Sequence, residues 1–234
     1  HFPETESAAE RIKKLGEEGW RIHVVGSTYI DRIVKKMYVP NPEARAKYGL
    51  TAGEKYFLII FHPDTYLSQE KNYQAAKNLL AAVKNTGLKA VMTYPCSDPG
   101  YQGVLDAMAE IKDDSQFSIH QNIDNLDFLG LMSDAQAIIG NSSSAVVEAP
   151  YFQLAAVNVG RRQEGRDREE NVVDCEATAE DISAKIKFVL EDVGFREKLK
   201  KRGHRLGNGQ AAEKILGVLK NVNIDEKLMK KHIA

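Results

Sequence analysis

Three consecutive serines stand in the segment "GNSSSAVVEAP", residues 140–150, directly after the apolar run "AQAII" and before a segment with a helical pattern. The first turn of a helix has N–H groups without intrahelical partners and a partial positive charge, and small residues let a phosphate approach that backbone. Ser142, Ser143 and Ser144 would add hydroxyl donors, and Glu148 follows one turn later. A simple helix cap needs only one serine or asparagine. The run of three therefore favours an anion-binding turn.

A histidine occupies a second position where chemistry is expected. His62 follows the apolar run "YFLIIF" directly, and Pro63 prevents that strand from continuing. A histidine at the carboxyl end of a strand in an α/β sheet points into the ligand crevice, where it could donate to a phosphate or transfer a proton. A histidine that only caps the loop fits the sequence equally well.

The third candidate is the loop "NVGRRQEGRDREENVV", residues 158–173, which contains two glycines and several arginines. Glycines allow backbone bends, and arginine offers a planar fork for phosphate or sugar oxygens. The acidic residues of the same run bring its net charge near zero, as in a solvated charged loop. Its position keeps the binding interpretation open, because it follows the strand next in sequence to the serine turn and both loops can open on one crevice.

These loops must be positioned by a regular scaffold, and the sequence predicts one. Short apolar runs rich in β-branched residues alternate with amphipathic stretches of helical period, which predicts a doubly wound parallel sheet in a Rossmann-like α/β fold. The expected strands cover 21–26, 56–62, 89–95, 117–123, 135–140, 154–160 and 171–175. The expected helices cover 6–16, 69–87, 103–114, 126–135, 179–192 and 211–222, with a further helix in the tail 223–234.

Composition limits the class of protein. The 234 residues are 43% hydrophobic and 28% charged, which suits a globular chain with a substantial core. The net charge of −1 provides no overall field for nucleic acid or an anionic membrane, so any anion site must be local. Two cysteines far apart indicate neither a zinc site nor a disulfide framework, and a cytoplasmic setting fits best. No apolar run approaches the ~20 residues needed to span a bilayer, and the first residues do not show the basic-then-apolar pattern of a signal peptide. Because it begins with His1 rather than Met, we expect a fragment of a longer protein.

Several motifs in one order resemble the UDP-N-acetylglucosamine 2-epimerase family, most closely its hydrolysing branch. They are "HPDT" at 62–65, "GNSSSAVVEAP" at 140–150, "NVGRRQEGRDREENVVD" at 158–174 and "GNGQAAEKILGVL" at 207–219. The resemblance implies two Rossmann-like domains in the GT-B arrangement with the UDP-sugar between them, of which this chain is similar to the C-terminal one. We expect a UDP-binding domain over residues 1–223 and, over 224–234, a helix that packs on the missing N-terminal domain.

The resemblance also implies roles for individual residues. Phe128, in "NLDFLGLM", would lie against the uracil, although a core aromatic on a helix is the plain alternative. Ser142, Ser143 and Ser144 would bind the diphosphate, Glu148 would accept hydrogen bonds from the ribose hydroxyls, and His62 would contact the diphosphate as it leaves. The sugar side would be lined by Arg161, Gln163 and Arg166. Gly207 and Gly209 would let the last helix start close to the nucleotide.

The family's reaction is an elimination that removes the C2 proton and expels UDP, followed by addition of water, which gives N-acetylmannosamine for the synthesis of sialic acid or related sugars. It requires no cofactor and no metal. The carboxylates beside C2 would come from the upstream domain, so we expect this chain alone to bind UDP or UDP-N-acetylglucosamine weakly and to turn over little. The intact protein is expected to be a homo-oligomer. A GT-B glycosyltransferase that uses a UDP-sugar and a stand-alone UDP-binding module are the alternatives.

Overall fold

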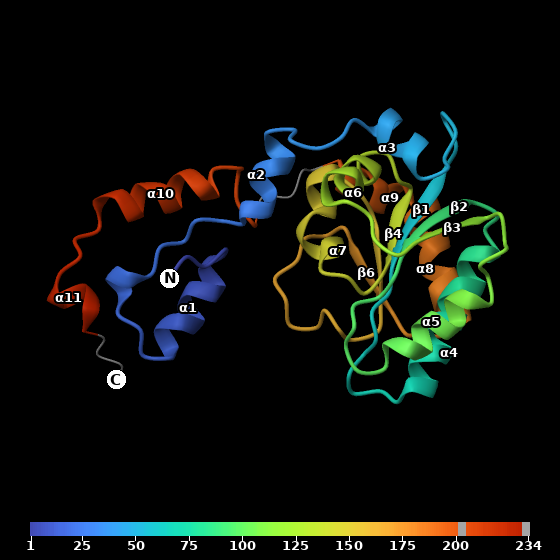
Figure 1. The fold of residues 1–234 in the computed structure, drawn as a ribbon, viewed down its shortest axis with the longest axis horizontal. Coiled ribbons are helices and arrows are strands. Elements are labelled where there is room, and N and C mark those ends of the chain that lie inside the picture. Colours follow the sequence, from blue (N-terminus) through green and yellow to red (C-terminus); the bar gives the residue numbers. More distant parts are fainter. Residues whose placement is uncertain (201–204, 231–234) are drawn as a thin grey trace. The chain divides into compact units, whose positions relative to one another are not determined.

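The computed structural model describes residues 1–200 and 205–230, and the chain divides into two compact units (Figure 1). One unit consists of His1–Met37 with Gly203–Ala234, and the other of Tyr38–Arg202. The sheet that we expected within residues 1–223 lies wholly in the second unit. Residues 1–37 group with the C-terminal segment instead. That residues 224–234 pack on a further domain stays a prediction.

The second unit contains a six-stranded sheet in which every pairing is parallel. Its strands are β1 (Tyr56–Ile60), β2 (Lys89–Thr93), β3 (Phe117–His120), β4 (Ala137–Gly140), β5 (Ala156–Val159) and β6 (Val172–Cys175). They lie in the order β3-β2-β1-β4-β5-β6. This is the order of a Rossmann-like sheet, so the predicted fold class is confirmed.

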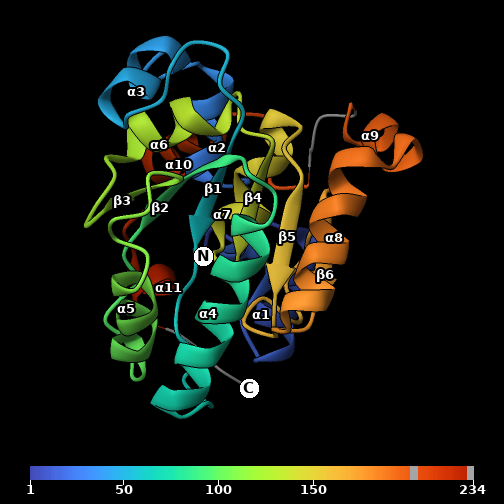
Figure 2. The same ribbon diagram turned by 90° about the vertical axis from the view of Figure 1, so that its right-hand side faces the viewer.

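Helices cover both faces of this sheet, as Figures 1 and 2 show. One face carries α4 (Gln69–Lys84), α5 (Tyr101–Ala109) and α8 (Ala179–Glu191), and the opposite face carries α6 (Asn125–Met132) and α7 (Ser144–Val147). The remaining helices are α3 (Asn41–Lys47) and α9 (Val193–Leu199), which the apolar periodicity did not predict. Both are short, at seven residues each, so they offer too few turns for a clear pattern.

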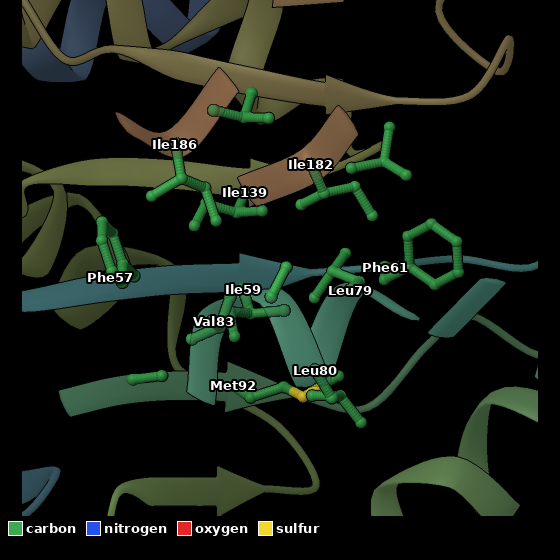
Figure 3. Packing of buried hydrophobic residues seen from close by; sticks show 14 of the residues in the cluster. Phe57, Ile59, Phe61, Leu79, Leu80, Val83, Met92, Ile139, Ile182 and Ile186 are labelled. Carbon is green, nitrogen blue, oxygen red and sulfur yellow. The ribbon is translucent and has the colours of Figure 1, made fainter. Parts of the chain in front are cut away.

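The main core lies between the sheet and the helices α4, α5 and α8. Ile182 and Ile186 of α8 and Leu79 of α4 are each at most 1% exposed and pack toward Ile59 and Ile139 of the central strands (Figure 3). All five residues of β1 are buried, because helices cover it on both sides. Burial of each large aliphatic side chain stabilises the fold by about 1.5–3 kcal/mol. The central strands are thereby fixed, and so are the loops at their carboxyl ends.

The predicted strand over residues 21–26 is wrong. The segment follows a 3-10 turn over Gly19–Arg21 and runs extended, but it pairs with no strand. Its backbone bonds to residues 1–3 are few: the His23 N–H donates to the His1 carbonyl at 3.0 Å, the Val25 N–H donates to the Pro3 carbonyl at 3.1 Å, and the Arg21 carbonyl accepts from the His1 amino group at 2.7 Å. An apolar, β-branched sequence becomes part of a sheet only where a neighbouring strand satisfies its backbone, and residues 1–3 supply just these two acceptors.

The first unit is helical and contains α1 (Glu6–Lys14), α2 (Thr28–Val34), α10 (Ala211–Asn221) and α11 (Glu226–Met229). The Asp31 carboxylate accepts from the Ala211 and Ala212 N–H groups at 2.9 and 2.8 Å, which caps the start of α10. Gly207 lies against Gly26. A Cβ atom added to Gly207 would lie 3.1 Å from the Gly26 Cα. The helix predicted in the tail is one turn, and residues 231–234 of that prediction lie outside the described residues.

Gly140, the last residue of β4, should tolerate no side chain. Its φ is +136°, and a Cβ atom there would lie 2.0 Å from the Ile60 carbonyl oxygen of β1. Gly140→Ala should therefore lower the free energy of unfolding by about 3 kcal/mol, from the unfavourable φ together with the clash. Chemical denaturation measures this. Gly165→Ala is the control, because Gly165 shares a positive φ of +76° but has open space around it; it should cost about 1 kcal/mol. Equal losses in the two variants would contradict the steric argument.

Candidate functional site

The carboxyl ends of β1 and β4 lie side by side at the centre of the sheet, where the strand order reverses. The segments that follow these two strands run to opposite sides of the sheet. In open α/β sheets, ligands bind in the crevice between such segments. His62 follows the end of β1 by two residues, and Asn141 and the serine turn follow β4 directly. The structure therefore brings His62 and the serine turn together, and the residue that joins them, Asn141, lies 79 residues from His62 in the sequence.

Asn141 joins the two loops. Its backbone N–H donates to the Ile60 carbonyl at 3.1 Å. Its side-chain Oδ1 accepts from the His62 N–H at 2.7 Å, and its Nδ2 donates to the His62 carbonyl at 2.9 Å. Asn141 is buried, and sequence reasoning did not select it as a site residue, since an asparagine before a helix is ordinarily a cap.

The His62 imidazole has a defined protonation state. The Cys96 N–H donates to Nδ1 at 3.0 Å, so the proton of the neutral ring is on Nε2. Burial lowers the pKa of His62 to about 4; the nearby Arg162 charge adds to this effect and Asp98 opposes it. At neutral pH the ring is therefore a neutral hydrogen-bond donor through Nε2.

Arg162 brings a positive charge to the same place. Its Nη1 lies 3.4 Å from the Asn141 carbonyl oxygen, and its Nη2 lies 3.6 Å from Asp98 Oδ2. The Cys96 thiol donates to the same carboxylate oxygen at 3.1 Å; burial and this hydrogen bond raise the thiol's pKa, so the thiol stays protonated. Sequence reasoning passed over Arg162 for its neighbour Arg161. The only signal was the pair of adjacent arginines, which does not tell which one faces the crevice.

The serine turn offers backbone donors, but the helix behind it is short. The amides of Ser142 and Ser143 have no acceptor in the ranges that the structure describes, whereas the Ser144 N–H donates to Ser142 Oγ at 3.3 Å. Helix α7 is one turn and gives way to a 3-10 turn over Ala149–Phe152. The α-helix does not continue through Pro150, which has no N–H for the next intrahelical bond. The turn can therefore bind an anion through local N–H and hydroxyl groups rather than through a long helix dipole.

A family model described as UDP-N-acetylglucosamine 2-epimerase matches residues 1–220. The chain belongs to the UDP-N-acetylglucosamine 2-epimerase family. The resemblance read from the motifs is thereby confirmed.

Two relatives of this epimerase-family chain align with nearly its whole length. It is 28% identical to "UDP-N,N'-diacetylbacillosamine 2-epimerase (hydrolyzing)" of Legionella pneumophila, over 99% of this chain and 60% of the relative. It is 32% identical to "GDP/UDP-N,N'-diacetylbacillosamine 2-epimerase (hydrolyzing)" of Campylobacter jejuni, over 100% of this chain and 61% of the relative. The chain thus spans about three fifths of the length of the curated relatives that it matches.

Solved structures show the same fold. The Neisseria meningitidis UDP-GlcNAc 2-epimerase bound to UDP-GlcNAc superposes with a TM-score of 0.76 at 18% identity, over 95% of this chain and 61% of that one. The Staphylococcus aureus MnaA structure with UDP gives a TM-score of 0.74 at 19% identity, over 94% of this chain and 60% of that one. At these identities the likeness is one of fold.

Two further predicted residues of this epimerase-family chain, Glu148 and Phe128, are largely buried. Glu148 is 8% exposed at the end of α7, where its N–H donates to the Ser144 carbonyl at 3.1 Å. Phe128 is also 8% exposed, on α6, so most of its side chain lies in the interior. Either side chain can offer a ligand only a limited contact area.

The arginine loop separates into two environments. Gln163 is 1% exposed, and its Nε2 donates to the Asn141 carbonyl at 2.7 Å, so it lies behind the serine turn. Arg161 lines a polar hollow of about 300 Å³ at the carboxyl ends of β5 and β6, together with Asn158 and Arg168. Arg166 is exposed, and its N–H donates to the Gln163 carbonyl at 3.4 Å. Of the three predicted residues, the structure joins only Gln163 to the serine turn.

Within residues 1–200 and 205–230, no group of three histidine, cysteine or acidic side chains is arranged to hold a metal ion. Over the same ranges, no helix is both long and apolar enough to cross a bilayer. Cys96 and Cys175 are both free thiols.

The depressed pKa of His62 should make stability depend on acidity. The ring titrates near pH 4 when folded and near 6.5 when unfolded, so between these values the unfolded state binds more protons. The free energy of unfolding should therefore fall as the pH is lowered from about 6.5 to 4. His62 should account for about 1–2 kcal/mol of that fall, less than the full shift because the ring is partly solvated.

Urea denaturation of the wild type and of His62→Gln across this pH range isolates the contribution of the ring. The variant should show the shallower dependence, since its side chain does not titrate. Parallel curves for the two proteins would contradict the burial of a neutral ring.

Proposed function

We propose that this chain is the nucleotide-binding part of a hydrolysing UDP-N-acetylglucosamine 2-epimerase, which converts UDP-N-acetylglucosamine and water to N-acetylmannosamine and UDP. The observation that carries the proposal is the joining of His62 to the serine turn at the carboxyl ends of β1 and β4. The family membership supports the reaction class, and the hydrolysing relatives of Legionella pneumophila and Campylobacter jejuni support the branch.

The diphosphate is expected at the serine turn. The amides of Ser142 and Ser143 and the hydroxyls of Ser143 and Ser144 provide donors for its oxygens. Arg162, adjacent to the Asn141 carbonyl, supplies the positive charge that this nearly neutral chain lacks overall. Donors that are already in place stabilise the charge that develops on a departing diphosphate without reorganisation.

His62 acts as a hydrogen-bond donor in this scheme. Its Nδ1 already accepts from Cys96, and the ring is neutral at physiological pH, so Nε2–H is the group available to a phosphate oxygen. A neutral donor stabilises the leaving group and does not need to give up its proton. The proton at C2 must be removed by another group, which we expect from the remainder of the protein.

The nucleoside is expected beside Glu148 and Phe128. An ionised carboxylate can accept from both ribose hydroxyls, and these charge-assisted bonds are stronger than neutral ones. The small exposed part of Phe128 would offer the uracil an apolar contact. Arg161, Gln163 and Arg166 were expected on the sugar side; the buried position of Gln163 favours an indirect role for it.

In the proposed reaction a base removes the C2 proton and the C1–O bond to the diphosphate breaks, which gives an unsaturated sugar and UDP. Water then adds a hydroxyl group at C1 and a proton at C2 on the opposite face. Elimination followed by hydration consumes one water and is redox-neutral, so it requires no redox cofactor. A homo-oligomeric state and a cytoplasmic location stay predictions for the intact protein.

Nucleotide binding by this chain should depend on Glu148. Glu148→Gln should weaken UDP binding about 10-fold, because a neutral amide replaces a carboxylate in two hydrogen bonds. Calorimetric titration with UDP measures the effect, and Glu164→Gln on the exposed arginine loop is the control. Equal affinities for wild type and Glu148→Gln would contradict the ribose assignment.

The reaction itself is tested with the full-length protein and UDP-N-acetylglucosamine. Release of N-acetylmannosamine and UDP in equal amounts, without any acceptor, is the expected result. Release of UDP only when a second sugar or a lipid is added would identify a glycosyltransferase instead. Binding of UDP without turnover would indicate a nucleotide-binding module.

A further inference from the structure

The side chain of Asn141 replaces missing backbone partners at the end of the sheet. The β1–β4 pairing ends at Ile60 and Gly140, and Pro63 lacks the N–H that a longer β1 would need. Beyond that end, Asn141 Oδ1 accepts from the His62 N–H and Nδ2 donates to the His62 carbonyl, at 2.7 and 2.9 Å. One amide thereby satisfies both backbone groups of the histidine.

Asn141 is in turn held from behind by Gln163. The Gln163 Nε2 donates to the Asn141 carbonyl at 2.7 Å, and both side chains are nearly inaccessible, at 1% and 2% exposed. The Gln163 Oε1 is buried and has no hydrogen-bond partner among the described residues. An unsatisfied buried acceptor costs stability, so the donor end of Gln163 is the part that the fold uses.

The His62 ring is consequently fixed at two points. The Cys96 N–H holds Nδ1, and Asn141 holds the backbone from which the ring projects. These contacts leave the ring little freedom, so the direction of Nε2–H is set before a ligand arrives. Such preorganisation matters most for a donor that must meet one particular phosphate oxygen.

We propose that Asn141, supported by Gln163, is a positioning residue for His62, and that this amide clamp aims the Nε2–H at the nucleotide diphosphate. The inference rests on the proposed nucleotide site and extends it, because neither residue needs to touch the ligand. An amide is the side chain suited to the task. An aspartate could still accept from the His62 N–H, but it would place a negative charge against the His62 carbonyl and near the diphosphate.

The experiment uses the full-length protein, with UDP as the probe, and a double-mutant cycle between Asn141→Ala and His62→Ala. If Asn141 acts through His62, Asn141→Ala should weaken UDP binding about 10-fold in the wild-type background and less than about 3-fold when His62 is already alanine. Equal losses in both backgrounds would overturn the proposal, since Asn141 would then act on the serine turn alone.

A measurement that does not need UDP tests the positioning role independently of the proposed nucleotide site. Nitrogen-15 NMR of the His62 ring should show a neutral Nε2–H tautomer in the wild type, and in Asn141→Ala a mixture of tautomers with a pKa closer to 6.5. An unchanged His62 ring in Asn141→Ala would overturn the clamp. Failure of the wild type to bind UDP, with the ring changed as expected, would overturn the nucleotide assignment while the NMR result supports the clamp.

Gln163→Met keeps the proposal testable if Asn141→Ala does not fold. Methionine has nearly the same volume and removes both the donor to Asn141 and the unpartnered oxygen, so the midpoint of urea unfolding should change little. The His62 ring should shift in the same direction as in Asn141→Ala, and the Kd for UDP should rise about 3-fold. Glu164→Gln is the neighbouring control and should change neither reading. A Gln163→Met protein with a native His62 ring and native Kd would overturn the supporting role.

Discussion

The approach of β4 to β1 at Gly140 is the constraint on which the site depends. The Ile60 carbonyl lies so close that no Cβ atom fits, and this closeness puts the Asn141 N–H within 3.1 Å of the same oxygen. The asparagine side chain then reaches the backbone of His62. Because helices pack on both faces of the central strands, the geometry at this edge is rigid, and two distant loops meet as one site.

The site's electrostatics are local. The chain has almost no net charge, yet Arg162, two amides without acceptors in the described ranges and a neutral histidine donor meet near one turn. Burial keeps His62 neutral, which makes its role as a donor independent of pH across the physiological range. An anion is thus offered directional hydrogen bonds, while the Asp98 carboxylate partly offsets the Arg162 charge, which favours selection by geometry over general attraction.

The first unit shows how the two ends of the chain depend on each other. Asp31 caps the start of α10, and Arg21 donates to the carbonyls of Leu228 and Lys230 at the end of α11 at 2.9 Å each. The acidic cap at a helix start and the guanidinium at a helix end both complement the partial charges of the helix termini. Neither interaction is visible as a local pattern, because its partners are about 180 to 210 residues apart.

The sequence by itself determined the six strands of the sheet, its parallel class, and the positions of His62 and the serines just after strand ends, because apolar periodicity and strand boundaries are local signals. It failed for residues 21–26, where the apolar pattern was present but a partner strand was not. Only the tertiary structure decided that Asn141, Cys96 and Arg162 surround the histidine. Which side chain of a loop faces a site depends on strand register and on contacts between loops, and both arise only when distant segments pack.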